Sequence, residues 1–463
     1  MKKKVLGLDK NGIQKTLRLK NYFGDGSGQI ALNIISGLVG QLAYFYTDKI
    51  GLAATMVGTM LLIPKIFDAF TDLIMGYFVD RTNTKWGKAR PWLLWSSIPA
   101  GLSVVALFAV PSMLGTQGTF YYGLISNSFA TAIMFTMIAI PYGCMLSYVT
   151  KSTEERGTMG IYRALFGYIV GMIIAIALIP ITNALGGDQS AWIKVGAVFG
   201  VIVTGSLILT FFANKEQSSV LEYSDEEKLP FMQSLGYLLS NKYWVIMLVV
   251  MVLVNIIYAV AGASGIYYAK WVLKDENLIA LLGGIGLIPV FIGFPLTGYM
   301  SKKFGQSGAI RVSLIIGIIG TIIRGIFPTN LPIMLTASVF STFGTIPLMA
   351  IGGVLVNNTV EYGVWKYNKR IVGMTNSASS FGGKISGGLG AAMLGWVLGA
   401  MGYVGTAVAQ PQSAITGILI VSIWIPLALM IGILVAMLFY DLDDKFPMIM
   451  KELEVRKAQN ESH

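Results

Sequence analysis

Two carboxylates four residues apart, Asp68 and Asp72, lie in an otherwise apolar run. Lys65 precedes Asp68 by three residues, so all three side chains share one face of a helix. Ionisable groups inside a membrane are costly and mark ion pathways or binding sites. A paired acidic cluster can hold a proton or a sodium ion; the alternative is a structural salt bridge between helices. Two carboxylates against one lysine leave excess negative charge, which requires a partner from another helix or a cation from solution.

Two interior basic residues are candidate partners for these acids and, together with Ser380, candidate substrate-binding residues. Lys384 lies among small residues in the run 372–402, with Ser380 one turn before it. A lysine so far inside an apolar run cannot easily reach either membrane surface, so it is expected to face a water-filled cavity. Arg163 lies near the start of the run 159–184, and a structural or interfacial role is its alternative.

Polar residues also recur at four-residue spacing in the first apolar run, at Asp25, Gln29 and Asn33. Successive hydrogen-bonding groups on one helix face favour a sugar-like or otherwise polar ligand. Asn255 is a further interior polar candidate. Tyr142 is a candidate aromatic ring to stack on a sugar, although such rings are equally common as lipid-facing or interfacial residues.

Composition indicates how these residues are positioned. The chain has 463 residues, 54% of them apolar and 12% charged, with a mean hydropathy of +0.67. A membrane helix requires about 20 mostly apolar residues, and the sequence offers twelve such runs. We therefore predict an all-α membrane protein with twelve transmembrane helices. The expected spans are 22–46, 53–80, 92–112, 118–147, 159–184, 191–213, 242–270, 277–300, 311–328, 332–357, 372–402 and 411–440.

A long polar connection divides these spans six and six. It predicts an N-terminal six-helix half (1–213), a cytoplasmic linker (214–241), a C-terminal six-helix half (242–440) and a cytoplasmic tail (441–463). Alternate connections are basic, so we expect both termini to be cytoplasmic. The expected location is the plasma (inner) membrane. Two six-helix halves with a binding site near the midplane are typical of secondary transporters.

Several other functions are disfavoured by residue counts. The single cysteine, Cys144, excludes a disulfide framework, and the single histidine, His463, excludes histidine catalysis within the fold. The net charge of +11 lies in short segments between apolar runs, which favours membrane topology over nucleic-acid binding. No phosphate-binding GxxxxGK[ST] motif occurs. We therefore expect that the protein is not an enzyme and that it holds no cofactor and no metal beyond a possible transported Na+. We also expect that its N-terminal segment is not a cleaved signal peptide.

An ordered set of motifs resembles the glycoside–pentoside–hexuronide:cation symporters over most of the chain. These motifs are "FYTDKIGL", "IFDAFTDLIMGYFVDRTNTKWGKARPW", "IAIPYG", "STEERGTMGIYRALFG", "IYYAKWVL", "VEYGVWKYNKR" and "LGAMGYV". The resemblance implies the twelve-helix major facilitator fold, alternating access, and coupling of sugar entry to Na+ or H+. The implied cation-site residues are Asp68, Asp72, Thr71 and Thr136. Lys65, Arg163 and Lys384 match basic residues of the family.

The chain also departs from the family pattern. Ala139 replaces an aspartate that contacts sugar in a family member, and Gly143 replaces an aromatic residue. The first span of this chain has about three more residues than that of the same family member. The sugar-binding aspartate of that span therefore has no clear counterpart here, and Gln29 and Asn33 are the expected substitutes. With fewer carboxylates, the interior basic residues can outnumber the acids unless Asp25 also reaches the cavity. We therefore hypothesise an anionic substrate such as a hexuronide.

The segment after the second span also resembles the gating loop of major facilitators. Asp80 and Arg81 are expected to form salt bridges that open as the halves rotate, with Glu361 and Arg370 as the parallel pair in the second half. Ordinary anchoring of basic residues at the membrane surface explains Arg81 nearly as well.

The sequence thus predicts a transporter that imports a sugar or glycoside (pentoside, hexoside or hexuronide) by symport with Na+ or H+. The alternatives are a same-fold carrier of a lipid or organic anion, and a sugar sensor that does not transport. The expected partners are the sugar and membrane lipid, with no nucleic acid, and we expect the monomer to be functional.

Overall fold

A computed structural model of the chain describes residues 7–8, 14–150, 152–216, 231–367 and 372–461. The described part is built of helices and contains no β-strand, only isolated β-bridges, which confirms the predicted all-α class. The side chains of Asp80 and of residues 372–381 lie outside the description. The chain divides into two compact units, Met1–Ser224 with Val404–Val408 and Asp225–Tyr403 with Ala409–His463.

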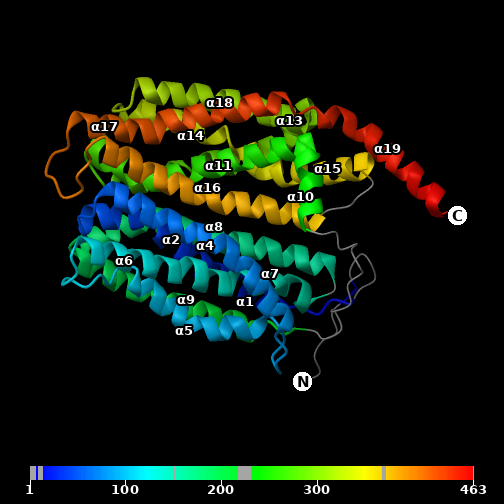
Figure 1. Cartoon of the computed structure of the whole chain (residues 1–463), viewed down its shortest axis with the longest axis horizontal. Helices are drawn as coiled ribbons and strands as arrows, with labels where there is room; N and C mark the ends of the chain where they lie inside the picture. Colours follow the sequence, from blue (N-terminus) through cyan, green and yellow to red (C-terminus); the bar gives the residue numbers. More distant parts are fainter. Residues whose placement is uncertain (1–6, 9–13, 151, 217–230, 368–371, 462–463) are drawn as a thin grey trace. The chain divides into compact units, whose positions relative to one another are not determined.

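The first unit is made of helices that follow the predicted apolar runs (Figure 1). Two short π-helical segments interrupt them, one at the end of the first run and one in the middle of the fourth. In chain order the elements are α1 (Leu19–Gly26), α2 (Gly28–Gly40), α3 (Leu42–Tyr44), π-helical Phe45–Lys49, α4 (Ala54–Arg81), α5 (Arg90–Ala106), α6 (Thr116–Ser128), π-helical Phe129–Phe135, α7 (Thr136–Val149), α8 (Thr153–Ala184) and α9 (Gln189–Ala213).

Close packing in this unit depends on glycine at one helix crossing. A Cβ atom built on Gly101 of α5 would lie 2.5 Å from the carbonyl oxygen of Gly200 on α9. The two helices therefore approach backbone to backbone and lie side by side in Figure 1, as small residues allow in membrane helices. α4 packs against α6 and α7, which brings the acidic segment of α4 next to the fourth run.

The second unit has the same helical character. Its elements are α10 (Phe231–Ser240), α11 (Lys242–Tyr267), π-helical Tyr268–Val272, α12 (Leu278–Ile285), α13 (Ile288–Ile326), α14 (Leu331–Phe343), α15 (Ile346–Tyr367), α16 (Val372–Ala400), α17 (Gln412–Leu419), π-helical Ile420–Trp424, α18 (Ile425–Leu438) and α19 (Leu442–Glu461). Within this unit α11 packs against α16 and α18, and α13 packs against α14.

The long helix α13 is broken at Gly305, which has φ +76° and ψ 171°. Only glycine adopts this conformation without steric cost. The carboxylate of Asp443 accepts a 2.6 Å hydrogen bond from the backbone N–H of Ser307, just after the break. The break falls between the predicted spans 277–300 and 311–328. The first span covers α12 and the start of α13, and the second lies after the break.

Eight helical segments of the described chain are long and apolar enough to cross a membrane, and this supports a multi-pass membrane protein. The eight are Leu19–Lys49, Thr116–Leu146, Glu154–Ala184, Gln189–Ala213, Lys242–Val272, Leu278–Ile326, Leu331–Tyr367 and Gln412–Leu438. The helices α4, α5 and α16 are not among them, so the full count of twelve spans belongs to the proposal below.

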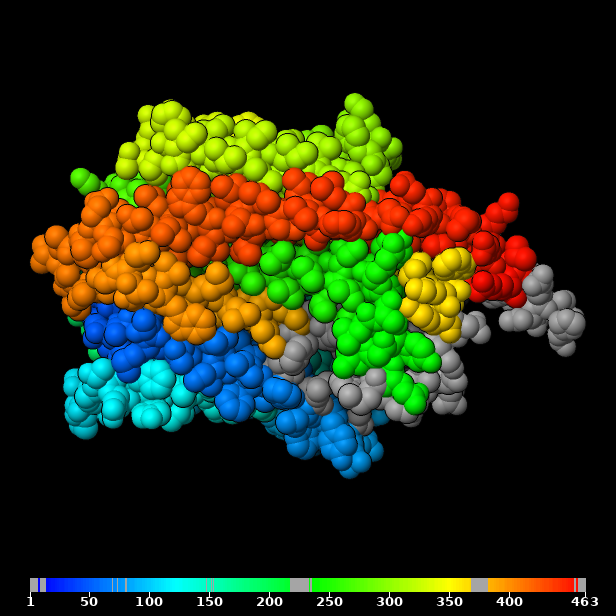
Figure 2. All heavy atoms as spheres, turned by 45° about the horizontal axis from the view of Figure 1, so that its top comes forward, coloured from blue at the N-terminus to red at the C-terminus, as the bar shows by residue number. Residues whose placement is uncertain are grey.

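The last helix of the described residues, α19, packs against α15 and extends beyond the ridge formed by α17 and α18 (Figure 2). Asp441, between α18 and α19, accepts hydrogen bonds from Lys445 and from the Tyr243 hydroxyl, the latter at 2.6 Å. These hydrogen bonds lower the pKa of Asp441 to about 2. The start of α19 is therefore fixed to α11 by a charged cluster at the helix ends.

Candidate functional site

The two predicted acids of α4 meet a hydroxyl from α7. Asp68 is buried, with 2% of its surface exposed, and Asp72 is half-buried one turn later. The Oγ1 atom of Thr136 lies 2.9 Å from Oδ1 of Asp68 and 3.1 Å from Oδ1 of Asp72. The structure thus brings together three of the four residues that the resemblance implied for a cation site.

The hydrogen-bond inventory of this cluster suits a cation. A threonine hydroxyl has one proton, so it cannot donate a full hydrogen bond to both carboxylates at once. Because the Oδ1 atoms of both carboxylates contact the same hydroxyl, the two carboxylates lie close together, and their negative charges repel each other. A cation among the three oxygens relieves this repulsion and leaves the hydroxyl lone pairs available as ligands, because hard cations prefer oxygen.

A π-helical segment positions the threonine. Phe129–Phe135 is π-helical and ends directly before Thr136, the first residue of α7. Each π turn accommodates one more residue than an α turn, so the segment changes which face α7 turns toward α4. Such segments inside α-helices often occur at functional sites. Nothing in the sequence analysis anticipated it.

The other two α4 residues play different structural parts. The hydroxyl of Thr71 donates a 3.1 Å hydrogen bond to the backbone carbonyl of Asp68, one turn earlier on the same helix. Its proton is thus directed to the backbone, and its role as a cation ligand stays a prediction. Lys65 is half-buried one turn before Asp68 on α4.

Arg163 of α8 forms a buried ion pair with Asp25 of α1. Its Nε and Nη2 atoms lie 2.6 Å and 2.8 Å from the two carboxylate oxygens, and the pair is 7% and 0% exposed. The Nδ2 of Asn214 donates a further 2.9 Å hydrogen bond to the same carboxylate. The hydroxyl of Tyr142 donates a 2.7 Å hydrogen bond to the backbone carbonyl of Asp25. The guanidinium of Arg163 lies 3.6 Å from the centre of the Tyr142 ring.

This arrangement changes the charge count in the first unit. The two-pronged contact neutralises Arg163 by Asp25, so the arginine does not add to an excess of interior positive charge. Bidentate, buried pairs of this kind hold helices in a fixed geometry. The sequence analysis named Arg163, Asp25 and Tyr142 separately as substrate-binding candidates, and missed both their mutual contact and Asn214.

The polar stripe of the first run continues on α2. The Nδ2 of Asn33 donates to the backbone carbonyl and the side-chain Oε1 of Gln29, at 2.9 Å and 3.1 Å. A Cβ atom on Gly167 of α8 would lie 3.1 Å from the same nitrogen, so glycine leaves space for the amide. Both amide side chains are half-buried and face α8.

In the second unit, Asn255 and Lys384 lie on the packed helices α11 and α16. The Nδ2 of Asn255 donates a 2.7 Å hydrogen bond to the carbonyl of Met251, and lies 3.8 Å from the position of a Cβ atom on Gly383. Lys384, the next residue, is half-buried. Ser380 belongs to α16, but its side chain lies outside the described part.

The predicted gating residues are only partly described. Arg81 is exposed at the end of α4, with its guanidinium 4.2 Å from the centre of the Tyr77 ring. Glu361 is half-buried on α15. The side chain of Asp80 and all of Arg370 lie outside the described residues, so the two expected gating pairs stay predictions.

A contact that sequence analysis missed fixes the connection between α4 and α5. The carboxylate of Glu216, which follows α9, accepts hydrogen bonds from the backbone N–H groups of residues 88, 89 and 90 at 2.7, 2.9 and 2.6 Å. Gly87 precedes them with φ +114°, and a Cβ atom there would clash with this carboxylate at 2.4 Å. The glutamate therefore supplies acceptors for N–H groups at the start of α5, which the helix itself cannot satisfy.

Comparison with known proteins agrees with this architecture. A family model described as "MFS/sugar transport protein" matches residues 24–444. The uncharacterized symporter YnaJ of Bacillus subtilis (strain 168) is 29% identical over 450 residues, 96% of each chain. The isoprimeverose transporter of Lactiplantibacillus pentosus is 27% identical and covers 98% of this chain and 94% of its own. The glucuronide carrier protein homolog of Escherichia coli (strain K12) is 27% identical, with 96% and 97% covered.

Solved structures share the fold at low sequence identity. The nucleoside transporter NupG matches with a TM-score of 0.60 and 14% identity, over 92% of this chain and 100% of that one. A bacterial homologue of the iron transporter ferroportin, in an inward-facing state, matches with a TM-score of 0.60 and 15% identity, over 92% and 99%. The predictions of a major facilitator fold and of a transporter rather than an enzyme are confirmed. The symporters among the relatives confirm the likeness of this chain to the glycoside–pentoside–hexuronide:cation symporters. Because the family model matches most of the sequence, the chain belongs to the MFS/sugar transport protein family.

Proposed function

We propose that the protein imports a sugar or glycoside by symport with a cation bound at Asp68, Asp72 and Thr136. The observation that supports this proposal is the contact of one hydroxyl with both carboxylates. The coupling ion is Na+ or H+. In this proposal the chain crosses the plasma (inner) membrane twelve times, has both termini in the cytoplasm and works as a monomer by alternating access.

Coupling follows from the chemistry of the acidic pair. The two carboxylates repel each other when the cation is absent, and binding of the cation removes that repulsion. If the outward-facing state binds the cation more tightly than the inward-facing state, the ion gradient biases the cycle toward import. The carboxylates release the ion where its concentration is low. The ion gradient drives accumulation, and its coupling to the sugar requires differential affinity between the two states rather than binding alone.

The substrate class is proposed from the relatives' names and from the polar residues of each unit. The relatives include an isoprimeverose transporter and a glucuronide carrier homolog. Gln29 and Asn33 in the first unit, and Asn255 and Lys384 in the second, are the proposed substrate-binding residues. The pairing of Arg163 with Asp25 weakens the hypothesis of an anionic substrate, because that arginine no longer contributes net charge.

Uptake by purified protein in proteoliposomes tests the proposal. A panel of labelled xylosides, glucosides and glucuronides is supplied under an imposed Na+ gradient, an imposed pH gradient, or neither. We expect uphill uptake of at least one neutral sugar under one of the two gradients, and counterflow exchange without either. A protein that binds sugar but shows no counterflow would be a sensor, and uptake that is indifferent to both gradients would contradict symport.

A further inference from the structure

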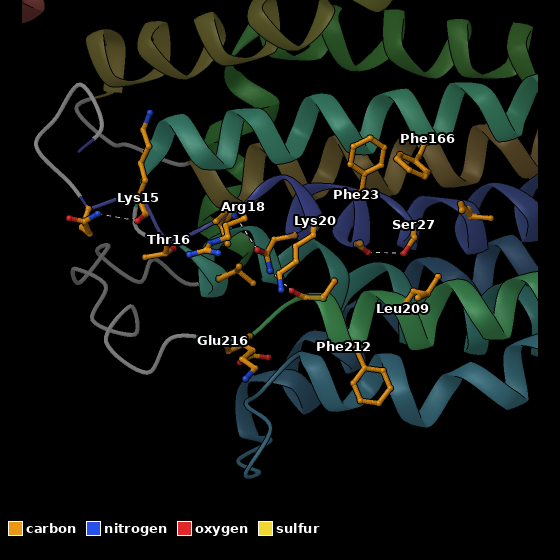
Figure 3. Close-up of a pocket in the computed structure, with 18 residues that line it drawn as sticks. Lys15, Thr16, Arg18, Lys20, Phe23, Ser27, Phe166, Leu209, Phe212 and Glu216 are labelled. Carbon is orange, nitrogen blue, oxygen red and sulfur yellow. Dashed lines mark hydrogen bonds between the residues drawn. The ribbon is translucent and has the colours of Figure 1, made fainter. Parts of the chain in front are cut away.

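A pocket of about 1140 Å³ lies in the first unit, outside the acidic site. It is bounded by the segment before α1, by α1 itself, by α8 and α9, and by residues 215–216 (Figure 3). Its lining includes four basic residues and one acidic residue, together with several phenylalanines. Basic and aromatic side chains thus line the same pocket.

The residues that line the pocket carry an excess of positive charge. Among them, the side chains of Lys20 and Lys215 are exposed. Lys15 pairs with Glu154 at 2.6 Å and so contributes little net charge. The acid of the lining, Glu216, directs its carboxylate to the backbone N–H groups at the start of α5. The pocket therefore offers cations to an anion that enters from outside.

The chain that presents these cations is held in place. Glu155 of α8 is 1% exposed, and one of its carboxylate oxygens accepts hydrogen bonds from the backbone N–H groups of Thr16 and Leu17 at 2.8 Å and 2.7 Å. These bonds fix the segment directly before Arg18 and α1. A binding site whose backbone is already ordered avoids the entropy cost of ordering it on binding.

The other wall is apolar and open. Phe23 of α1 is 49% exposed, and Leu209 and Phe212 of α9 are 61% and 68% exposed. Phe23 packs edge-to-face on Phe166 of α8 at 5.9 Å, so the wall is continuous across two helices. In a membrane protein, exposed apolar side chains face the acyl chains of lipids, and a basic cluster next to them faces the lipid head groups.

We propose that this pocket binds an anionic phospholipid. The phosphate lies between Lys20 and Lys215, and the acyl chains lie along Phe23 and the outer face of α9. Basic pockets between membrane helices bind anionic lipid head groups in this way. The cytoplasmic leaflet is the anionic one, so the inference rests on the proposed cytoplasmic position of the N-terminus. The lipid would fix α1 and the segment after α9 together at the membrane surface.

Lipid binding to the full-length protein in detergent tests this site by native mass spectrometry. Phosphatidylglycerol and phosphatidylcholine of equal chain length are titrated against the wild type, against Lys20→Gln/Lys215→Gln, and against the control Lys302→Gln/Lys303→Gln. The control removes the same charge from two exposed lysines in the second unit. We expect the affinity of the pocket variant for phosphatidylglycerol to fall by about tenfold or more, while the control binds this lipid as the wild type does. Circular dichroism confirms that each variant is folded.

A second arm separates a lipid from a free anion. Phe212→Ala is expected to weaken phosphatidylglycerol binding, and glycerol 3-phosphate at equal concentration is expected not to displace the lipid. Displacement by glycerol 3-phosphate would show a site for a soluble phosphate and overturn the proposal. Equal binding of both lipids, or equal losses in the pocket and control variants, would overturn it as well.

Discussion

The substitution Asp72→Asn removes a charge from the proposed cation site and changes little else. Asparagine has the size of aspartate and keeps an oxygen at the position that lies 3.1 Å from Thr136 Oγ1. The threonine can therefore donate to the amide as it does to the carboxylate. Asp72 is half-buried rather than sealed in the core, so the neutral amide is tolerated by the fold. Any change in transport then reports the loss of charge.

The expected magnitude follows from electrostatics. One unit charge about 4 Å from a cation contributes about 4 kcal/mol at an effective dielectric constant of about 20. Since about 1.4 kcal/mol corresponds to a factor of ten in affinity, cation binding should weaken by about a thousandfold. The amide also takes up no proton in the working pH range. The same loss of coupling is therefore expected whether Na+ or H+ drives uptake.

The assay separates coupling from sugar binding. Proteoliposomes with the wild type or with Asp72→Asn are compared for uphill sugar uptake under an ion gradient and for sugar counterflow with no gradient. We expect uphill uptake to be abolished and counterflow to be retained, because counterflow needs exchange of sugar but no net movement of the cation. Thr59→Val is the control, since the Thr59 hydroxyl lies on the same helix nine positions before Asp68, donates to the backbone carbonyl of Thr55 and carries no charge.

Two results would refute this reasoning. Undiminished uphill uptake by Asp72→Asn would show that this carboxylate does not bind the coupling ion. Loss of both sugar binding and counterflow in a folded Asp72→Asn variant that still binds the cation as the wild type does would place the residue in the sugar site instead.

Three further predictions concern residues that the structure connects. Thr136→Val should raise the half-saturating cation concentration about tenfold, the effect of one lost oxygen ligand, while the control Thr59→Val should change it little; equal effects in uptake titrations would contradict the site. Asp25→Asn should lower the free energy of unfolding by about 3–5 kcal/mol, because it leaves Arg163 as a buried, unbalanced charge, and a thermal unfolding midpoint equal to that of the wild type would contradict it. Glu216→Gln should speed hydrogen exchange at the amides of residues 88–90, by replacing a charged acceptor with a weaker neutral one, and unchanged exchange there would show that the carboxylate does not hold this connection.

The sequence by itself determined the class of the protein. Apolar runs of membrane length, the acids Asp68 and Asp72 on one helix face, and the ordered motifs were sufficient to predict the all-α fold and the family, and both are confirmed. These features are local: the period of an α-helix places residues four apart on one face whatever the rest of the chain does. The same reasoning located the polar stripe at Gln29 and Asn33.

The tertiary structure alone decided which residues meet across helices. Thr136 reaches Asp68 across 68 positions of the sequence, and Arg163 reaches Asp25 across 138. Thr136 entered the predicted site only through the family resemblance, and the pairing of Arg163 with Asp25 was not predicted. Helical periodicity gives the face of each helix but not its rotation against a neighbour. That rotation depends on close packing at glycines such as Gly101 and on the π-helical turn before Thr136, which no local pattern reveals.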